Sequence, residues 1–375
     1  MCNIAITDPQ RFYGRTQELQ ELHGLLDAAI KPVPRGLMGF VQGYLKSGKT
    51  SLVHIFLGEL LEQRDPACLT TYIEAWRKER AEDFFKRLCE CLAQAMREFS
   101  VRVQEERSNL ITSDLQETLR NLTSSQPLVI AIDEAPRLFD AASADESSRD
   151  QLIKFASFIA ACPRLLVLWI GPTSAARVLP PPFQELLLSR SVPIRLSPFS
   201  ERDVHRLLSA EKLDLVHRIH VQASISQQVH RSCSGDPFWV GSLAHVMWEE
   251  ASKRHESEVR YLKEDVERSQ QRLWLGEAAF TLRFTHMSEG NKSVARTILN
   301  EFGKRLNQEA AVLFTSEEIT ALLETRAVDC NSVRDALDEL EAVGLVVRLS
   351  DNHSFKYSLS APIMEGYVVR GGTFR

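Results

Sequence analysis

Two glycines, a lysine and a threonine stand at the spacing of a phosphate-binding loop. Gly43, Gly48, Lys49 and Thr50 form the pattern G-x4-G-K-T, with apolar residues before and after it. Glycines let successive backbone N–H groups curve around a β-phosphate, the lysine brings positive charge to the β and γ oxygens, and the threonine hydroxyl can bind Mg²⁺. The loop therefore predicts binding of a nucleoside triphosphate. Its expected cofactor-binding residues are Gly43, Ser47, Gly48, Lys49, Thr50 and Ser51.

Two adjacent carboxylates follow a second apolar run. Residues 128–132 are all apolar, which is typical of a buried parallel strand, and Asp133 and Glu134 come next. Ligands bind at the carboxyl ends of such strands. We expect Asp133 to hold Mg²⁺, directly or through water, and Glu134 to orient and deprotonate the water that attacks the γ-phosphate. Lys49 and Glu134 are thus predicted catalytic residues, with ATP and Mg²⁺ as cofactors.

Further apolar runs predict the elements that position these residues. Helix-length stretches separate the runs at 37–41, 69–73, 128–132, 165–170 and 192–196. Alternating strands and helices indicate an α/β fold with a parallel, doubly wound sheet.

Composition places few limits on function. The 375 residues carry a net charge of −5 and are 44% hydrophobic and 25% charged, as in ordinary globular proteins. There is no overall basic character, so any contact with nucleic acid has to be local. The seven cysteines lack the spacing of a zinc site, and no apolar run is long enough to span a membrane. We expect a cytoplasmic location with reduced thiols and no membrane partner.

Two less specific motifs support a family resemblance. Residues 12–19 read F-Y-G-R-T-Q-E-L, and Gly235-Asp236-Pro237 precedes an apolar helix. With the phosphate loop and the acidic pair, these motifs resemble STAND ATPases and initiator-type AAA+ P-loop ATPases, often described as archaeal-type ATPases. The resemblance implies that Tyr13, Gly14 and Arg15 lie against the base and ribose, and that Pro237, in a helical lid, packs near the adenine.

The resemblance also suggests catalytic residues outside the two main motifs. Thr173 follows the apolar run at 165–170 and is the nearest match to the polar residue that senses the γ-phosphate; a helix cap is an equal alternative. Arg190 ends an apolar helix and resembles the arginine finger that reaches a neighbour's nucleotide. Complementing a helix dipole is the simpler role for such an arginine. Arg177 and Arg195 are competing finger residues.

The C-terminal segment has the order of elements found in winged helices. Helices are expected at 294–306, from 316 and from 331, followed by a hairpin of 346–349 and 355–359. Residues 291–375 contain 10 Lys/Arg against 12 Asp/Glu. The third helix is expected to expose four carboxylates beside Arg334, namely Asp335, Asp338, Glu339 and Glu341. Because such a helix would repel DNA phosphates, we favour a protein-contact or autoinhibitory winged helix over a DNA reader.

The sequence therefore predicts three domains and two alternative functions. The domains are a P-loop ATPase core at 1–198, a helical lid with a connector helix at 199–288, and a winged helix at 289–375. The leading hypothesis is a switch that oligomerises with nucleotide and controls a separate effector protein in signalling or defence. The alternative is a DNA-associated ATPase of initiator or transposition-helper type. A scaffold that binds ATP without turnover is a third possibility, against which Glu134 argues.

Overall fold

The computed structural model forms two compact units. The first comprises residues 1–43 and 48–196, and the second comprises 44–47 and 197–375. The structure describes residues 7–8, 12–31, 36–62, 68–103, 114–172, 185, 189–209, 218–254, 258–276, 278–308, 312–324, 328–351 and 354–370. Within these ranges no helix combines the length and the apolar character needed to cross a bilayer.

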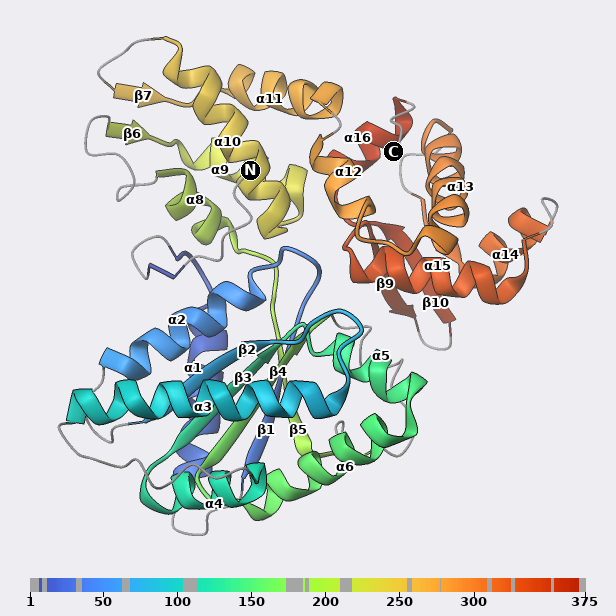
Figure 1. Ribbon diagram of the computed structural model, residues 1–375. Coiled ribbons are helices and arrows are strands. Elements are labelled where there is room, and N and C mark those ends of the chain that lie inside the picture. Colours follow the sequence, from blue (N-terminus) through green and yellow to red (C-terminus); the bar gives the residue numbers. More distant parts are fainter. Residues whose placement is uncertain are drawn as a thin grey trace. The chain divides into compact units, whose positions relative to one another are not determined.

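The first unit is a five-stranded parallel sheet between two layers of helices. Its strands follow the order β2-β3-β4-β1-β5, so their carboxyl ends share one edge (Figure 1). This confirms the predicted α/β fold with a parallel sheet core. The strands are β1 (Leu37–Gln42), β2 (Leu69–Glu74), β3 (Leu128–Asp133), β4 (Leu165–Gly171) and β5 (Ser191–Arg195). The helices are α1 (Thr16–Ile30), α2 (Lys49–Glu62), α3 (Ala81–Val103), α4 (Leu115–Ser125), α5 (Pro136–Ala144) and α6 (Glu146–Ala161).

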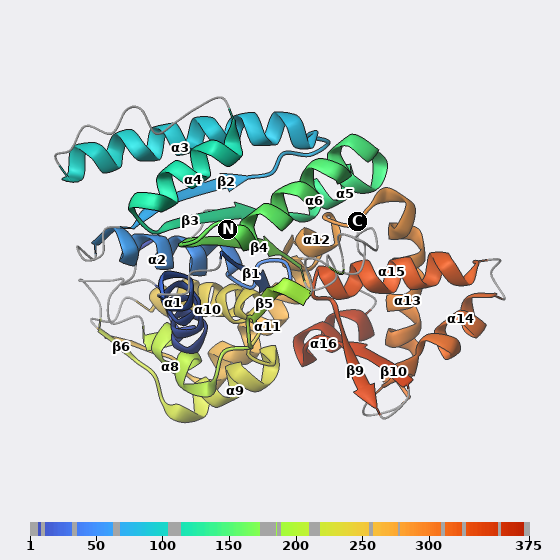
Figure 2. The same ribbon diagram turned by 90° about the horizontal axis from the view of Figure 1, so that it is seen from below.

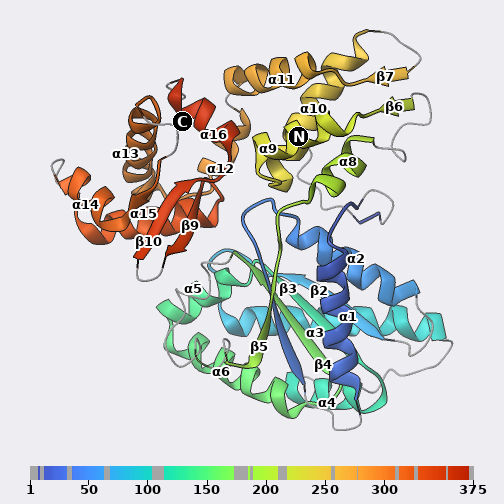
Figure 3. The same cartoon turned by 180° about the vertical axis from the view of Figure 1, so that it is seen from behind.

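Burial of both sheet faces explains why the central strands are continuously apolar. Side chains alternate between the two faces of a strand. In β3, Val129 and Ala131 pack into the core beneath α1 and α2, whereas Leu128, Ile130 and Ile132 pack into the core beneath α3 to α6. Figures 2 and 3 show these two helical layers from different sides. A polar residue within β3 would therefore meet a core on either face.

The second unit contains most of the remaining helices and two small sheets. Its first part has α8 (Glu201–Ser209), β6 (Arg218–His220), α9 (Ala223–Cys233), α10 (Pro237–Ser252), β7 (Glu258–Arg260), α11 (Lys263–Gly276) and α12 (Ala278–Phe284). Its second part has α13 (Glu289–Leu306), β8 (Phe314–Thr315), α14 (Ser316–Glu324), α15 (Cys330–Ala342), β9 (Val346–Asp351), β10 (Ser354–Leu359) and α16 (Pro362–Val369). Strands β8, β10 and β9 form an antiparallel sheet.

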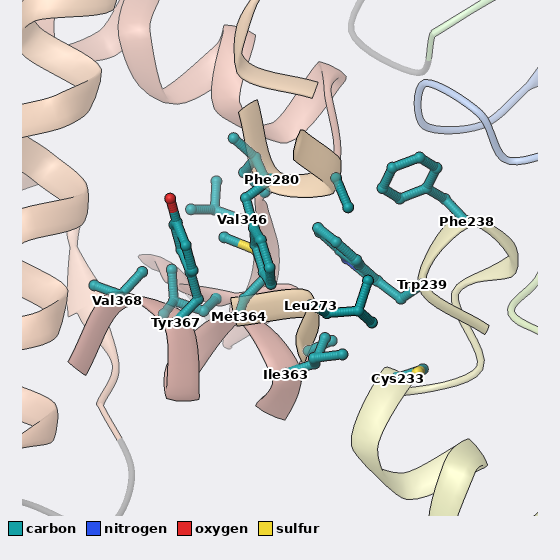
Figure 4. Packing of buried hydrophobic residues seen from close by; sticks show 14 of the residues in the cluster. Cys233, Phe238, Trp239, Leu273, Phe280, Val346, Ile363, Met364, Tyr367 and Val368 are labelled. Atoms are coloured by element: carbon teal, nitrogen blue, oxygen red, sulfur yellow. The ribbon is translucent and has the colours of Figure 1, made fainter. Parts of the chain in front are cut away.

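One hydrophobic cluster runs through both parts of the second unit. It extends along the chain from Val204 to Val368. The Phe280 and Tyr367 rings stack with centroids 3.9 Å apart, and Trp239 lies 4.8 Å from Phe280 (Figure 4). The division at residue 288 into a lid and a winged helix stays a prediction, and the two segments share this core.

A buried ion pair crosses the same region. The Arg283 side chain is fully buried and donates from Nη2 to both carboxylate oxygens of Asp236, at 2.8 and 2.9 Å. Its Nη1 donates to the Gly344 carbonyl at 2.6 Å. Asp236 also accepts the backbone N–H of Phe238, so it caps α10. The buried Arg283 guanidinium therefore links helix α12 to the start of α10 and to the turn before β9.

The expectation of four exposed carboxylates on the third C-terminal helix is wrong. Glu341 is buried and lies 3.1 Å from Arg348, which also pairs with Asp338. Glu339 is half-buried and accepts hydrogen bonds from Ser288 at 2.7 and 2.8 Å. Of the four, only Asp335 is exposed. Because the partners come from β9 and from the start of α13, the spacing within the helix could not indicate them.

Candidate nucleotide site

The phosphate loop connects β1 to α2 with the geometry of an anion cradle. Gly48 has φ of +95°, a conformation strained for any residue with a Cβ, and Lys46 also has positive φ, at 64°. Turns of this kind direct successive N–H groups into one concavity. Helix α2 begins at Lys49, whose Nζ donates to the Gly43 carbonyl at 3.0 Å. The helix therefore adds its positive end to the same place.

Asp133 is the centre of the polar site. Its Oδ2 accepts hydrogen bonds from Thr50 Oγ1 at 2.6 Å and from the Tyr72 hydroxyl at 2.7 Å, and its Oδ1 accepts from the Glu134 N–H at 2.8 Å. The register that pairs Glu74 with Asp133 aligns the ends of β2 and β3. Three donors thus hold a nearly buried carboxylate in one orientation beside the phosphate loop.

Tyr72 is a site residue that the sequence reasoning missed. Burial, followed by the charge of Asp133, raises the pKa of its phenol, so Tyr72 stays protonated and donates. The ring of His54, from α2, lies 4.4 Å from the Tyr72 ring, and burial lowers the pKa of this histidine. The sequence did contain one indication of this role: Tyr72 is an aromatic residue close to the end of β2, the strand that pairs with β3 and its acidic end.

Glu134 stands in a tight turn between β3 and α5. Its φ is +52°, uncommon for a residue other than glycine, and its side chain is half-exposed. Burial raises the pKa of Glu134, and the positive charge of Arg137 opposes that rise. The Glu134 Oε2 atom lies 3.6 Å from Arg137 Nε. A carboxylate at the exposed rim of the site, beyond the buried Asp133, is suited to accept a proton from water.

The donor set fits magnesium. A threonine hydroxyl and a carboxylate are hard oxygen ligands, and Mg²⁺ is usually held by one or two carboxylates together with phosphate oxygens and water. In the ranges that the structure describes, no three His, Cys, Asp or Glu side chains gather into a metal site of their own. Thr50 and Asp133 are accordingly the residues that would hold the ion.

The structure places the predicted base-side residues at the start of α1. Arg15 is buried, has φ of 67°, and pairs through Nη1 with Glu18 Oε1 at 3.1 Å. Gly14 also has positive φ, at 68°. These residues build the turn into α1, and contact of Tyr13, Gly14 and Arg15 with a base stays a prediction. Ser47 in the phosphate loop and Ser51 in the first turn of α2 are both buried.

The remaining predicted residues fall in different parts of the chain. Arg190 is exposed and precedes β5, whose amino end lies at the sheet edge opposite the phosphate loop. Arg195 ends β5 beside Gln42 and is therefore at the same edge as the loop. Thr173 and Arg177 lie outside the described residues. Pro237 opens α10 in the second unit.

Comparison with known proteins supports the assignment of the core. Residues 11–170 match the family model described as AAA ATPase domain. None of the curated proteins compared with this chain matches it. The ADP form of the ORC2 protein of Aeropyrum pernix has 11% identity, with a TM-score of 0.54 over 98% of this chain and 96% of that chain. The first unit thus has the fold of AAA+ P-loop NTPases.

Two further solved structures have TM-scores below 0.5 and show no more than a general likeness. The ORC1 protein of Aeropyrum pernix in complex with DNA has 18% identity, covers 96% of this chain and 94% of its own, and gives a TM-score of 0.46. The Thermotoga maritima RuvB Holliday junction branch migration motor has 14% identity, covers 92% of both chains, and gives a TM-score of 0.48. The family match supports an AAA ATPase domain. The STAND subtype and the winged helix stay predictions.

Proposed function

We propose that this chain is a Mg²⁺-dependent ATPase. The observation that carries the proposal is the contact of Thr50 with Asp133, which joins the phosphate loop to the acidic strand end beside Glu134. Lys49 and the loop N–H groups bind the β- and γ-phosphates, and Glu134 orients the attacking water and accepts its proton. When bound by Thr50 and Asp133, Mg²⁺ neutralises charge on the phosphate oxygens.

Substituting Thr50 tests how the metal is held. We expect Thr50→Ala to raise the Mg²⁺ concentration for half-maximal phosphate release about tenfold, as is usual when a residue that supports a metal is removed. Thr50→Ser keeps the hydroxyl and should retain the wild-type concentration. Phosphate release measured over a Mg²⁺ series checks this. Wild-type protein that releases no phosphate at any Mg²⁺ concentration would refute the ATPase proposal itself.

We further propose a homo-oligomer with Arg190 acting between subunits. Arg190 lies at the sheet edge away from its own phosphate loop, so it would contact the nucleotide of another copy. This position supports the finger role and leaves Arg195, beside the loop, as the alternative within one subunit. Hydrolysis would then depend on assembly.

We propose duplex DNA as the partner, ahead of a separate effector protein. One surface loop supports this choice. The loop after β2 exposes Trp76, Arg77, Lys78 and Arg80, and 58% of the Trp76 surface is accessible. Basic residues gathered on one surface are the electrostatic footprint of a nucleic-acid-binding site. The acidic third C-terminal helix had favoured a protein partner, but most of its carboxylates are engaged within the unit.

A buried acid organises this basic loop, residues 76–80. The buried Glu79 accepts the Trp76 N–H at 2.9 Å and pairs with Arg87 at 2.6 and 2.7 Å. The Arg87 guanidinium lies 3.8 Å from the centre of the Trp76 ring. The buried Glu79 therefore neutralises Arg87, and Arg80 lies 3.9 Å from Asp145. The Arg77 and Lys78 side chains are exposed.

Replacing two of these charges tests the DNA contact. We expect Arg77→Ala with Lys78→Ala to weaken binding to random-sequence duplex DNA on the order of tenfold, and to reduce the slope of log affinity against log salt by about 0.9 for each phosphate that is no longer neutralised. Binding titrations over a salt series measure both. The control Lys154→Gln removes an exposed charge from α6 and should bind as wild type does.

A protein-directed switch is the second candidate function. The net charge of −5 favours it, because an acidic chain binds nucleic acid weakly outside a local basic surface. Assembly that requires ATP and is unchanged by DNA, with wild-type and loop variants alike, would support this switch and a separate signalling or defence effector. It would also overturn the DNA proposal.

A further inference from the structure

Arg137 joins the catalytic edge of β3 to the end of β2. Its Nη1 donates to Glu74 Oε1 at 2.9 Å and to the Ala75 carbonyl at 2.8 Å. Its Nε faces Glu134 Oε2 at 3.6 Å. Two acceptors at the end of β2 therefore hold Nη1, and a second nitrogen of the same guanidinium, Nε, lies near the carboxylate predicted to activate water.

Glu134 needs a restraint of this kind. Its backbone is held by the tight turn, in which Arg137 N–H donates to the Glu134 carbonyl at 3.0 Å. Its side chain is 46% exposed and has rotatable bonds that the turn does not fix. Apart from Arg137, the charged groups around it are Asp133 on β3, Glu74 on β2 and Lys49 on α2. Both carboxylates repel Glu134, and in the described site Arg137 is the cation with a direct contact to it.

We propose that Arg137 is a positioning residue that orients the Glu134 carboxylate, which in turn activates the water that attacks the γ-phosphate. The inference rests on the proposed ATPase function. Arg137 contacts neither the phosphate loop nor Asp133 in the interactions of the described residues. Its effect is therefore on the turnover step rather than on nucleotide binding.

A structural role predicts a different outcome from a positioning role. Ion pairs between half-exposed side chains contribute about 0–1 kcal/mol to folding. The side chains of Arg137 and Glu74 are 34% and 52% exposed. Removing Arg137 should therefore leave the melting temperature and the KM for ATP near their wild-type values. A misplaced catalytic group, by contrast, lowers kcat.

The test combines kinetics with a double-mutant cycle. We expect Arg137→Gln to lower kcat about tenfold with little change in KM, since misplacement by about 1 Å can cost up to 100-fold. Arg137→Lys should restore part of the loss, because one ammonium can contact Glu134 or the Ala75 carbonyl but lacks the planar fork. In a Glu134→Gln background, Arg137→Gln should cause no further loss, since no carboxylate remains to be oriented. Fluorescent ATP analogue binding should be unchanged throughout.

Several results would overturn the inference. They are an unchanged or increased kcat in Arg137→Gln, an equal tenfold loss in the Glu134→Gln background, or a change in ATP binding as large as the change in kcat. If Arg137→Gln fails to fold, Arg137→Lys and its combination with Glu134→Gln decide by the same criteria. Failure of the ATPase proposal is distinguishable, because wild-type protein would then show no turnover for Glu134→Gln to reduce.

Discussion

Glu134→Gln is expected to lower kcat for ATP hydrolysis about 1,000-fold while ATP still binds. Proton transfer by a positioned side chain contributes about 100- to 10,000-fold, and glutamine cannot accept the proton. The substitution keeps the shape of the side chain, and the three hydrogen bonds to Asp133 do not involve the Glu134 carboxylate. Phosphate release under single-turnover conditions and the affinity for a fluorescent ATP analogue measure the two effects separately.

The matched control for this experiment is Glu82→Gln. Glu82 lies on α3, is 63% exposed and pairs with Lys86 one turn later. This variant should hydrolyse ATP as wild type does. A Glu134→Gln protein that retains a tenth or more of wild-type turnover would show that another group activates the water. If the ATP-bound form assembles, light scattering should find Glu134→Gln trapped in the larger species, with and without duplex DNA.

Arg283→Leu is expected to destabilise the second unit by about 3–5 kcal/mol, because it leaves the Asp236 carboxylate largely buried without its partner. The Arg283 side chain is 0% and that of Asp236 10% exposed, so water can hydrate the remaining charge only poorly. The Gly344 carbonyl loses a donor as well. Unfolding in urea, followed by tryptophan fluorescence, measures the loss; Trp239 lies in the adjoining core.

Two further variants separate charge burial from packing. Arg272→Leu removes an arginine that pairs with Glu249 and Glu250 on the surface of the same unit, and should cost about 0–1 kcal/mol. Combining Arg283→Leu with Asp236→Asn removes both charges and keeps an amide oxygen for the α10 cap, so part of the stability should return. Equal losses in Arg283→Leu and Arg272→Leu would contradict the proposed cost of an unpaired buried charge.

The candidate nucleotide site could be predicted from the sequence where its residues lie close together in the chain. The glycines and Lys49 fall within one short loop, and their spacing alone predicts a contact with phosphate. The alternation of apolar runs predicts the parallel sheet. Once the sheet is parallel, Asp133 must lie at the same edge as Thr50, and the observed 2.6 Å hydrogen bond agrees with that expectation.

Contacts between distant segments were not predictable in this way. Tyr72 reaches Asp133, and Arg137 reaches Glu74 and Ala75, through the register of β2 against β3, which no local pattern specifies. The exposure of the α15 carboxylates was misjudged for the same reason, since Arg348 on β9 engages Glu341 and Asp338. The buried pair of Asp236 and Arg283 likewise joins residues from separate helices.

The sequence by itself determined the α/β sheet, the phosphate loop and the identity of its carboxylates, because spacing and periodicity act over a few residues. Only the tertiary structure decided which charges are exposed and which are engaged. That property depends on the neighbours that each side chain meets when segments far apart in the chain pack together. It governs both how Glu134 is held and which charges remain on the surface for a partner.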